Sequence, residues 1–74
     1  MNIIICGAGR VGFSISKQLS AQGHSITVID QSSEFIQKIN ETLDVKGFVG
    51  RATFPSVLEK AGAKDADMII AVTQ

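Results

Sequence analysis

Three glycines follow the first apolar run of this chain at the spacing G-x-G-x-x-G, as Gly7, Gly9 and Gly12. Glycine weakens a helix or a strand by about 0.5–1 kcal/mol relative to alanine, so three glycines this close together need a compensating reason. Residues 2–6, just before them, are dominated by β-branched isoleucine. Such a run is typical of a strand covered on both faces. The motif therefore predicts a tight turn that leads from a buried strand into a helix.

Strand patterns recur three more times along the chain, over residues 25–30, 45–49 and 68–72, and helical patterns lie between them. A β-α-β-α-β-α-β order specifies a parallel sheet with right-handed crossovers and the strand order 3-2-1-4. The predicted fold class is therefore α/β, a Rossmann-like doubly wound parallel sheet truncated to four strands with three helices. Residues 1–74 are expected to form one domain. Its fourth strand would be an unpaired edge, so we expect a fragment or a chain that associates.

Three helices are predicted from apolar spacing and from capping residues. The first covers residues 10–22, where apolar side chains fall four apart. The second begins at a cap supplied by Ser32 or Ser33. It carries an apolar stripe made of Phe35, Ile36, Ile39 and Leu43. The third has Thr53 as its cap and Pro55 in its first turn, where a missing N–H costs nothing.

Charge and composition exclude several classes of protein. Seven basic and seven acidic side chains cancel, so no basic field attracts nucleic acid or an anionic membrane. The single cysteine, Cys6, forms no internal disulfide and is interpreted as a core residue. The absence of a signal-type segment and of a membrane-length apolar run predicts a cytoplasmic domain without membrane insertion. His24 has no second His or Cys cluster nearby, so no metal site is expected. Asp65 and Asp67 are interpreted as a solvated connection and not as a catalytic pair.

The glycines lie in the context of a dinucleotide-binding fingerprint. They follow a strand and open a helix, and Asp30 ends the next strand, eighteen residues after Gly12. Gly7 would permit the turn, Gly9 would let backbone N–H groups approach a pyrophosphate, and Gly12 would let the helix lie close to the sheet. In the alternative interpretation the glycines serve turn and packing only, which explains Gly12 better than Gly9.

The Asp30 carboxylate, at the carboxyl end of the second strand, is placed to accept hydrogen bonds from both hydroxyls of an adenosine ribose. It would repel a 2′-phosphate by roughly 4 kcal/mol per unit charge at about 4 Å and an effective dielectric near 20. NAD(H), ATP or ADP is therefore predicted in preference to NADP(H). Alternatively, Asp30 is an exposed strand-end acid or a cap for the next helix. Arg10 opposes the dipole of the first helix unless a phosphate pairs with it, and a solvated arginine is the other interpretation.

Four stretches of the chain resemble a known family. They are "MNIIICGAGRVG" (residues 1–12), "ITVID" (26–30), "GRATFP" (50–55) and "VLEKAGAKDADMIIAVT" (57–73). Together they resemble the N-terminal nucleotide-binding domain of Trk-type potassium-uptake regulators, the TrkA-N family, also called KTN or RCK domains. The last stretch is the most specific, because a generic dehydrogenase has no reason to repeat it. The resemblance implies binding of NAD(H) or adenine nucleotides, control of a membrane potassium channel or transporter, and no catalysis.

Carried over by position, the resemblance also implies a set of site residues. The phosphates would be cradled by Gly7, Ala8, Gly9, Arg10 and Val11. Asp30 would hold the ribose, Arg51 and Ala52 would border the adenine, and Thr73 and Gln74 would reach the second half of the ligand. The implied partner is a membrane potassium-transporter subunit at the inner face of the cell membrane, bound by a homo-oligomeric full-length protein.

Two other hypotheses stay open at this point. One is the cofactor-binding half of an NAD-dependent dehydrogenase, which would need a proton-transfer residue and a substrate pocket from a second domain. The sequence offers no candidate for that residue. The other is a non-functional fragment that has inherited the pattern.

Overall fold

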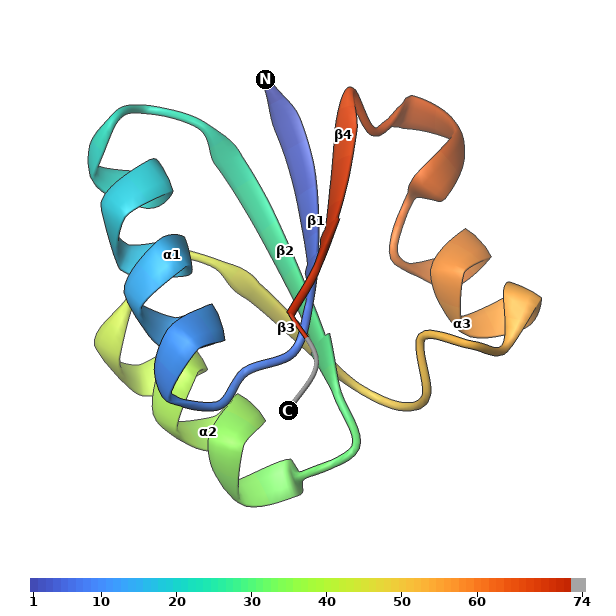
Figure 1. The fold of residues 1–74 in the computed structure, drawn as a ribbon, viewed down its shortest axis with the longest axis horizontal. Helices are drawn as coiled ribbons and strands as arrows, with labels where there is room; N and C mark the ends of the chain where they lie inside the picture. Colours follow the sequence, from blue (N-terminus) through green and yellow to red (C-terminus); the bar gives the residue numbers. More distant parts are fainter. Residues whose placement is uncertain (73–74) are drawn as a thin grey trace.

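A four-stranded parallel sheet forms the centre of the molecule in the computed structural model, which describes residues 1–72 (Figure 1). The strands are β1 (Asn2–Cys6), β2 (Ser25–Asp30), β3 (Lys46–Val49) and β4 (Met68–Ala71). The helices are α1 (Arg10–Ala21), α2 (Ser33–Thr42) and α3 (Pro55–Lys60), followed by the short 3-10 turn η1 (Ala63–Asp65). The strand order is β3-β2-β1-β4, so the predicted fold class and strand order are confirmed.

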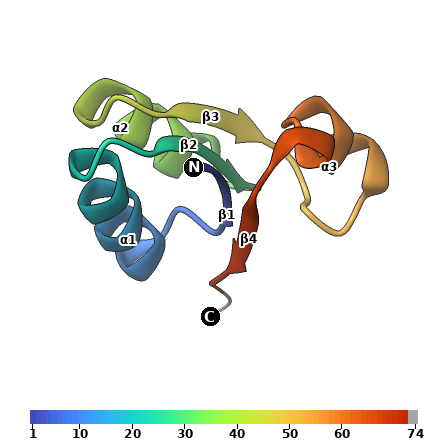
Figure 2. The same ribbon diagram turned by 90° about the horizontal axis from the view of Figure 1, so that it is seen from above.

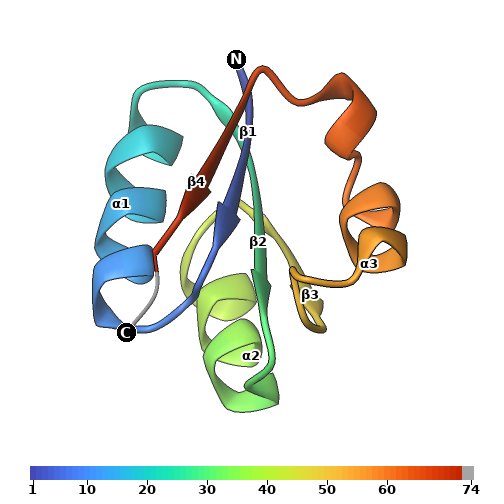
Figure 3. The ribbon, with the colours of Figure 1, turned by 45° about the vertical axis from the view of Figure 1, so that its right-hand side comes forward.

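The order of the strands places the helices in two layers. In the middle of the sheet, Ile5 of β1 pairs with Val28 of β2 on one side and with Ile70 of β4 on the other. The chain moves one way across the sheet from β1 to β3 and then returns past β1 to β4. Because such crossovers are right-handed, α1 and α2 cover one face and α3 covers the other (Figures 1 and 3).

The main core lies between the sheet and the pair α1 and α2. Its buried members are Ile3, Ile5, Ala8, Ile26, Val28, Ile36 and Ile39. Residues two apart on a strand share a face, which explains why alternate isoleucines of β1 enter this core. From α1, a glycine and a small polar residue face the sheet, Gly12 and Ser16. The Ser16 hydroxyl donates to the Gly12 carbonyl at 2.7 Å, so its burial leaves no unpaired group.

The opposite face of the sheet is covered less completely. Ile4 and Ile29 are 2% and 1% exposed there. However, no residue of α3 is buried. On β4, Met68 and Ile69 are 44% and 50% exposed. Among the residues that the structure describes, β4 is an edge strand, as predicted. The sheet also twists, and β3 and β4 at its two edges point in clearly different directions in Figure 2.

Two local predictions are wrong. Thr53 does not cap α3, because the N-cap is Phe54, which makes no side-chain capping bond. The residue before a proline is driven into extended conformation, and Phe54 has φ −88° and ψ 121°, so the helix begins at Pro55 itself. Phe35 does not join the apolar stripe of α2, since it is 41% exposed.

Candidate functional site

A pocket opens at the carboxyl ends of β1 and β2, where α1 begins. Its volume is about 280 Å³. Five residues predicted for a ligand line it, together with three others: Gly7, Gly9, Arg10, Val11 and Asp30, and then Gly12, Phe35 and Val72. Ligands of doubly wound sheets bind at this edge, because loops and helix N-termini converge there.

Two of the glycines are required by the turn itself. Gly7 has φ 128°, and a Cβ at this position would overlap the carbonyl oxygen of Val72. A Cβ on Gly12 would overlap the carbonyl oxygen of Gly7. Gly9 differs, since its φ of −70° and ψ of −164° are extended values that any residue adopts. Backbone conformation and packing therefore account for Gly7 and Gly12, whereas the backbone conformation of residue 9 does not require a glycine.

The first turn of α1 presents unpaired backbone donors to this pocket. Gly9 is the N-cap and supplies no side-chain cap, and the first helical bond runs from Phe13 N–H to the Gly9 carbonyl at 2.8 Å. Within residues 1–72, the N–H groups of residues 9–12 have no hydrogen-bond acceptor. Helix N-termini carry about half a positive elementary charge, so four such donors form a favourable environment for an anion.

Both carboxylate oxygens of Asp30 accept backbone hydrogen bonds, one from the glycine turn and one from the start of α2. Oδ2 accepts a hydrogen bond from Ala8 N–H and Oδ1 accepts one from Ser32 N–H, each at 2.8 Å. Asp30 is half-buried and lines the pocket. An ionised carboxylate oxygen can accept two hydrogen bonds, so each oxygen keeps one acceptor position beyond these bonds. Asp30 is therefore neither a free strand-end acid nor the N-cap of α2, which is Ser32.

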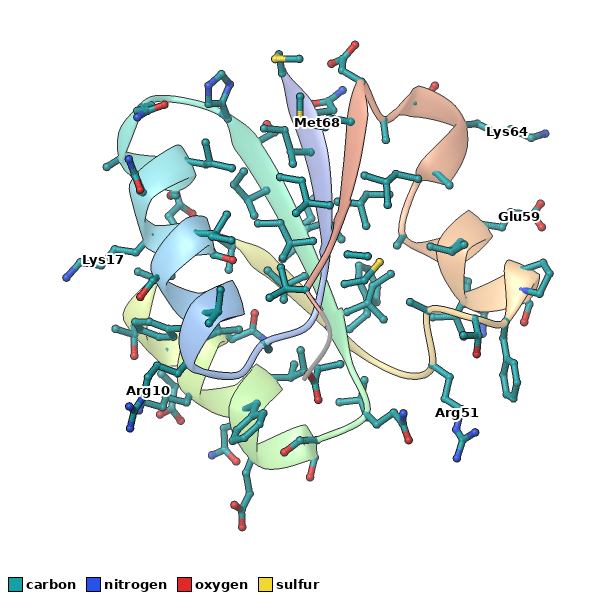
Figure 4. All side chains as sticks on the ribbon, viewed as in Figure 1. Arg10, Lys17, Arg51, Glu59, Lys64 and Met68 are labelled. Carbon is teal, nitrogen blue, oxygen red and sulfur yellow. The ribbon has the colours of Figure 1, made fainter. Side chains whose placement is uncertain are left out.

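The other predicted site residues are distributed around the same edge of the sheet. Ala8 is buried at 4% exposure, and its N–H is already paired with Asp30. Arg10 is exposed in the first turn of α1. Arg51 is exposed and Ala52 is half-buried, and both follow β3 outside this pocket. Figure 4 shows the Arg10 and Arg51 side chains on opposite sides of the molecule. The contact of Arg51 and Ala52 with adenine stays a prediction. Thr73 and Gln74 lie outside the described residues.

Sequence reasoning missed Phe35 and Val72 as lining residues and treated Gly12 as a packing residue alone. Phe35 stands beside the buried Ile36 on α2, at the margin of the apolar stripe, so spacing did not separate it from the core. Its place in the first turn was the available signal, because α2 begins at the same sheet edge as the pocket. Its backbone N–H donates to the capping oxygen of Ser32 at 3.2 Å.

A larger hollow of about 540 Å³ lies at the opposite, amino-terminal edge of the sheet. The chain just past the carboxyl ends of α1 and α2 borders it, at Gly23 and Asp44, together with the acidic Asp65. Helix C-termini carry partial negative charge, so this hollow is unfavourable for an anionic ligand even though Lys46 also lines it. The hollow is larger than the pocket at α1, but its charge makes it the less suitable of the two for an anion.

The contacts of Cys6, His24 and Asp67 belong to the fold and not to the pocket at α1. Burial raises the pKa of the Cys6 thiol above its ordinary value of 9.0, which favours the neutral, unreactive form. His24 Nδ1 lies 3.2 Å from the N-terminal amine, and the Asp67 carboxylate accepts the Asn2 N–H at 2.7 Å.

Across residues 1–72, no group of three or more His, Cys, Asp or Glu side chains is placed to hold a metal. In that same part of the chain, no helix combines the length and the apolar character needed to span a bilayer.

Known proteins resemble this chain over nearly its whole length. The TrkA-N domain family model matches residues 3–74. "Trk system potassium uptake protein TrkA" of Azorhizobium caulinodans is 45% identical over 73 residues, and that of Halomonas elongata is 41% identical. Each match covers 99% of this chain and 16% of the relative. A TrkA homolog of Pyrococcus abyssi is 38% identical, with 32% of its length covered.

A solved structure shares the fold of this chain. The structure described as "Shewanella denitrificans Kef CTD in AMP bound form" matches with a TM-score of 0.78 and 36% identity. The match covers 100% of this chain and 44% of that one. The chain thus spans less than half the length of each of these relatives. Together with the strand order and the glycine turn, the family match confirms the resemblance drawn from the sequence, and the chain belongs to the TrkA-N domain family.

Proposed function

We propose that residues 1–74 form a regulatory domain that binds an adenine nucleotide at the amino end of α1. The observation that carries this proposal is the group of backbone N–H donors at residues 9–12: these residues line the pocket, and their N–H groups have no acceptor in the described chain. The match to a structure titled as an AMP-bound Kef domain supports the same ligand class.

We assign a role to each lining residue from the backbone groups and side-chain atoms that it has available for a ligand. The diphosphate would lie against the N–H groups after Gly9, with Gly7 shaping the turn and the exposed Arg10 available as a counter-charge. Val11 would border the ligand. Ala8 would act through the turn, because its own N–H is paired. Asp30 would accept the ribose hydroxyls at its remaining lone pairs. Beyond the pocket, the proposed contacts are Arg51 and Ala52 with adenine, and Thr73 and Gln74 with the second half of the ligand.

The preferred ligand is NAD(H), with ATP or ADP as alternatives and NADP(H) disfavoured. The Asp30 carboxylate lies on the pocket wall, where it would face the 2′-position of the ribose. A 2′-phosphate would bring two further negative charges toward it. At an effective dielectric near 20, each such charge costs roughly 4 kcal/mol at about 4 Å, and partial solvent exposure reduces this.

The biological role we propose is control of potassium uptake. The relatives of 36–45% identity are named as Trk potassium-uptake proteins or their homologs, which supports a regulatory subunit and not an enzyme. The partner would be a membrane potassium-transporter subunit, met at the cytoplasmic face of the membrane by a homo-oligomer of the full-length protein. Nucleotide occupancy can act on such a partner only through unequal affinity for two conformations.

Calorimetry with NADH, NAD, ATP, ADP and NADPH tests the nucleotide proposal. We expect NADPH to bind about tenfold or more weaker than NADH, equivalent to about 1.4 kcal/mol. Val11→Glu places a negative charge at the pocket wall and should weaken every nucleotide by a similar factor. Val11 is 56% exposed, so the fold should tolerate this change. Lys17→Glu is the control, because Lys17 does not line the pocket and its exposed side chain points outward from α1 (Figure 4).

A different result would contradict each of the proposed roles. Equal affinity for NADPH and NADH would remove the role of Asp30 at the ribose. Unchanged nucleotide binding by Val11→Glu would show that the ligand does not bind in this pocket. For the transport role, the measurement is potassium uptake by cells that lack their own regulator and carry a chimera of a full-length TrkA protein with this segment. A chimera that is expressed but restores no uptake contradicts that role.

A further inference from the structure

Asp30 touches the backbone of two different segments. Its Oδ2 accepts the N–H of Ala8 in the glycine turn, and its Oδ1 accepts the N–H of Ser32 at the start of α2, both at 2.8 Å. Hydrogen bonds to an ionised acceptor are stronger than those between neutral groups. One side chain therefore joins the pocket wall formed by the turn to the wall formed by α2.

The bond to Ala8 limits where the following amides can point. The preceding residue, Gly7, is already held by its N–H, which donates to the Ile29 carbonyl at 2.8 Å. The turn is thus tied to the end of β2 at two successive residues. Ala8 itself is buried, at 4% exposure. The donors at residues 9–12 follow directly, so their direction depends on both ties.

The bond to Ser32 extends the same unit to the far wall of the pocket. Ser32 is the N-cap of α2, and its Oγ accepts the N–H of Phe35 at 3.2 Å. Phe35 lines the pocket with the glycine turn and with Asp30. The position of this aromatic side chain therefore depends on a cap that Asp30 helps to hold.

Electrostatics makes the role of Asp30 testable, because charge and positioning act with opposite signs. A carboxylate beside an anion site repels the anion, so an Asp30 that acted through charge alone would bind diphosphates more tightly once neutralised. An Asp30 that mainly positions the donors would do the reverse, since its removal frees Ala8 and disorders the amides that follow.

We propose that Asp30 is the positioning residue of the anion-binding turn: it orients the N–H groups of residues 9–12 and ties them to α2, in addition to any contact with ribose. This role rests on the proposed nucleotide site. It predicts that Asp30 contributes to the binding of diphosphates that have no ribose hydroxyls at all.

The test uses 2′,3′-dideoxy-ADP as the probe, measured by calorimetry beside ADP on the full chain. We expect Asp30→Ala to weaken dideoxy-ADP by about tenfold or more, because a lost hydrogen bond to a charged group leaves the turn unsupported. Asp30→Asn keeps one acceptor oxygen and should lie between Asp30→Ala and the wild type. Asp67→Ala is the matched control, since Asp67 also accepts a backbone N–H, from Asn2 at 2.7 Å, at the opposite end of the sheet. It should leave dideoxy-ADP binding unchanged.

The outcomes separate the two proposals. Wild-type binding of ADP, with dideoxy-ADP bound equally or more tightly by folded Asp30→Ala, overturns the positioning role and leaves the nucleotide site standing. Binding of neither ligand by the wild type overturns both. If Asp30→Ala does not fold, hydrogen exchange of the ligand-free wild type decides the question. Slower exchange at Ala8 than at Gly9 supports the positioning role, and equal exchange contradicts it.

Discussion

Gly12 is the single residue at which the turn and the first helix meet most closely. A Cβ there would overlap the carbonyl oxygen of Gly7. The backbone of Gly7 is itself held in place, because its N–H donates a hydrogen bond to the Ile29 carbonyl. Alanine favours a helix interior over glycine by about 0.8–1.0 kcal/mol. Overpacking against a backbone group that cannot rotate away costs about 1–3 kcal/mol or more. The clash therefore outweighs the gain in helix propensity.

We expect Gly12→Ala to lower the free energy of unfolding by about 1–3 kcal/mol, measured by urea denaturation. Ser14→Ala serves as the control, because Ser14 is exposed on the same helix and alanine should be neutral or slightly stabilising there. A Gly12→Ala protein as stable as the wild type would show that α1 can move away from the turn at no cost.

The sequence identified different residues of this site with different success. Gly7 and Gly12 were predictable because glycine spacing after a strand has few explanations. The acceptor role of Asp30 toward Ala8 was not, because residues 22 apart in sequence meet only once β1 and β2 are paired. Phe35 was assigned to the apolar stripe of α2, because helical spacing identifies a face of the helix and not the end of the sheet that this face reaches.

At the scale of elements, α2 begins with a specific side-chain cap. Ser32 Oγ accepts the Phe35 N–H at 3.2 Å, whereas Ser33 is the first residue of the helix. Loss of such a cap typically costs about 0.5–2 kcal/mol. We expect Ser32→Ala to lower the free energy of unfolding by about 1 kcal/mol in urea denaturation.

Ser33→Ala is the matched control for that cap, since it removes the neighbouring hydroxyl and should change stability by only a few tenths of a kcal/mol. The reverse ranking of the two variants would assign the cap to Ser33. The start of α3 shows a different rule at work. There Pro55 sets the boundary and leaves Phe54 as a cap without a side-chain bond, so the polar Thr53 misled the prediction.

At the scale of the whole molecule, the two layers on the sheet differ in how much they bury. The core beneath α1 and α2 includes Ile39, which is 0% exposed. No residue of α3 is buried, and Leu58 is half-buried. Regions with few buried apolar contacts open locally at lower free energy than the global transition. We therefore expect amides of α3 to exchange hydrogen well before those of α2.

The two layers can also be compared by truncating one side chain in each and measuring the free energy of unfolding. Ile39→Ala should cost about 2–5 kcal/mol, because it removes a fully buried side chain and leaves a cavity. Leu58→Ala should cost less than about half as much, since solvent already reaches that side chain. Equal costs, or amides of α3 and α2 that exchange together, would show that the sheet and both layers unfold as one unit.

The sequence by itself determined the order of strands and helices, the parallel sheet and the glycine turn. These depend on local periodicity, β-branched composition and chain handedness, which act within short segments. Only the tertiary structure decided that Asp30 pairs with Ala8 and Ser32, that Phe35 lines the pocket, and that α3 covers its face loosely. Those features arise from contacts between distant segments, and such contacts exist only after strand pairing brings the segments together.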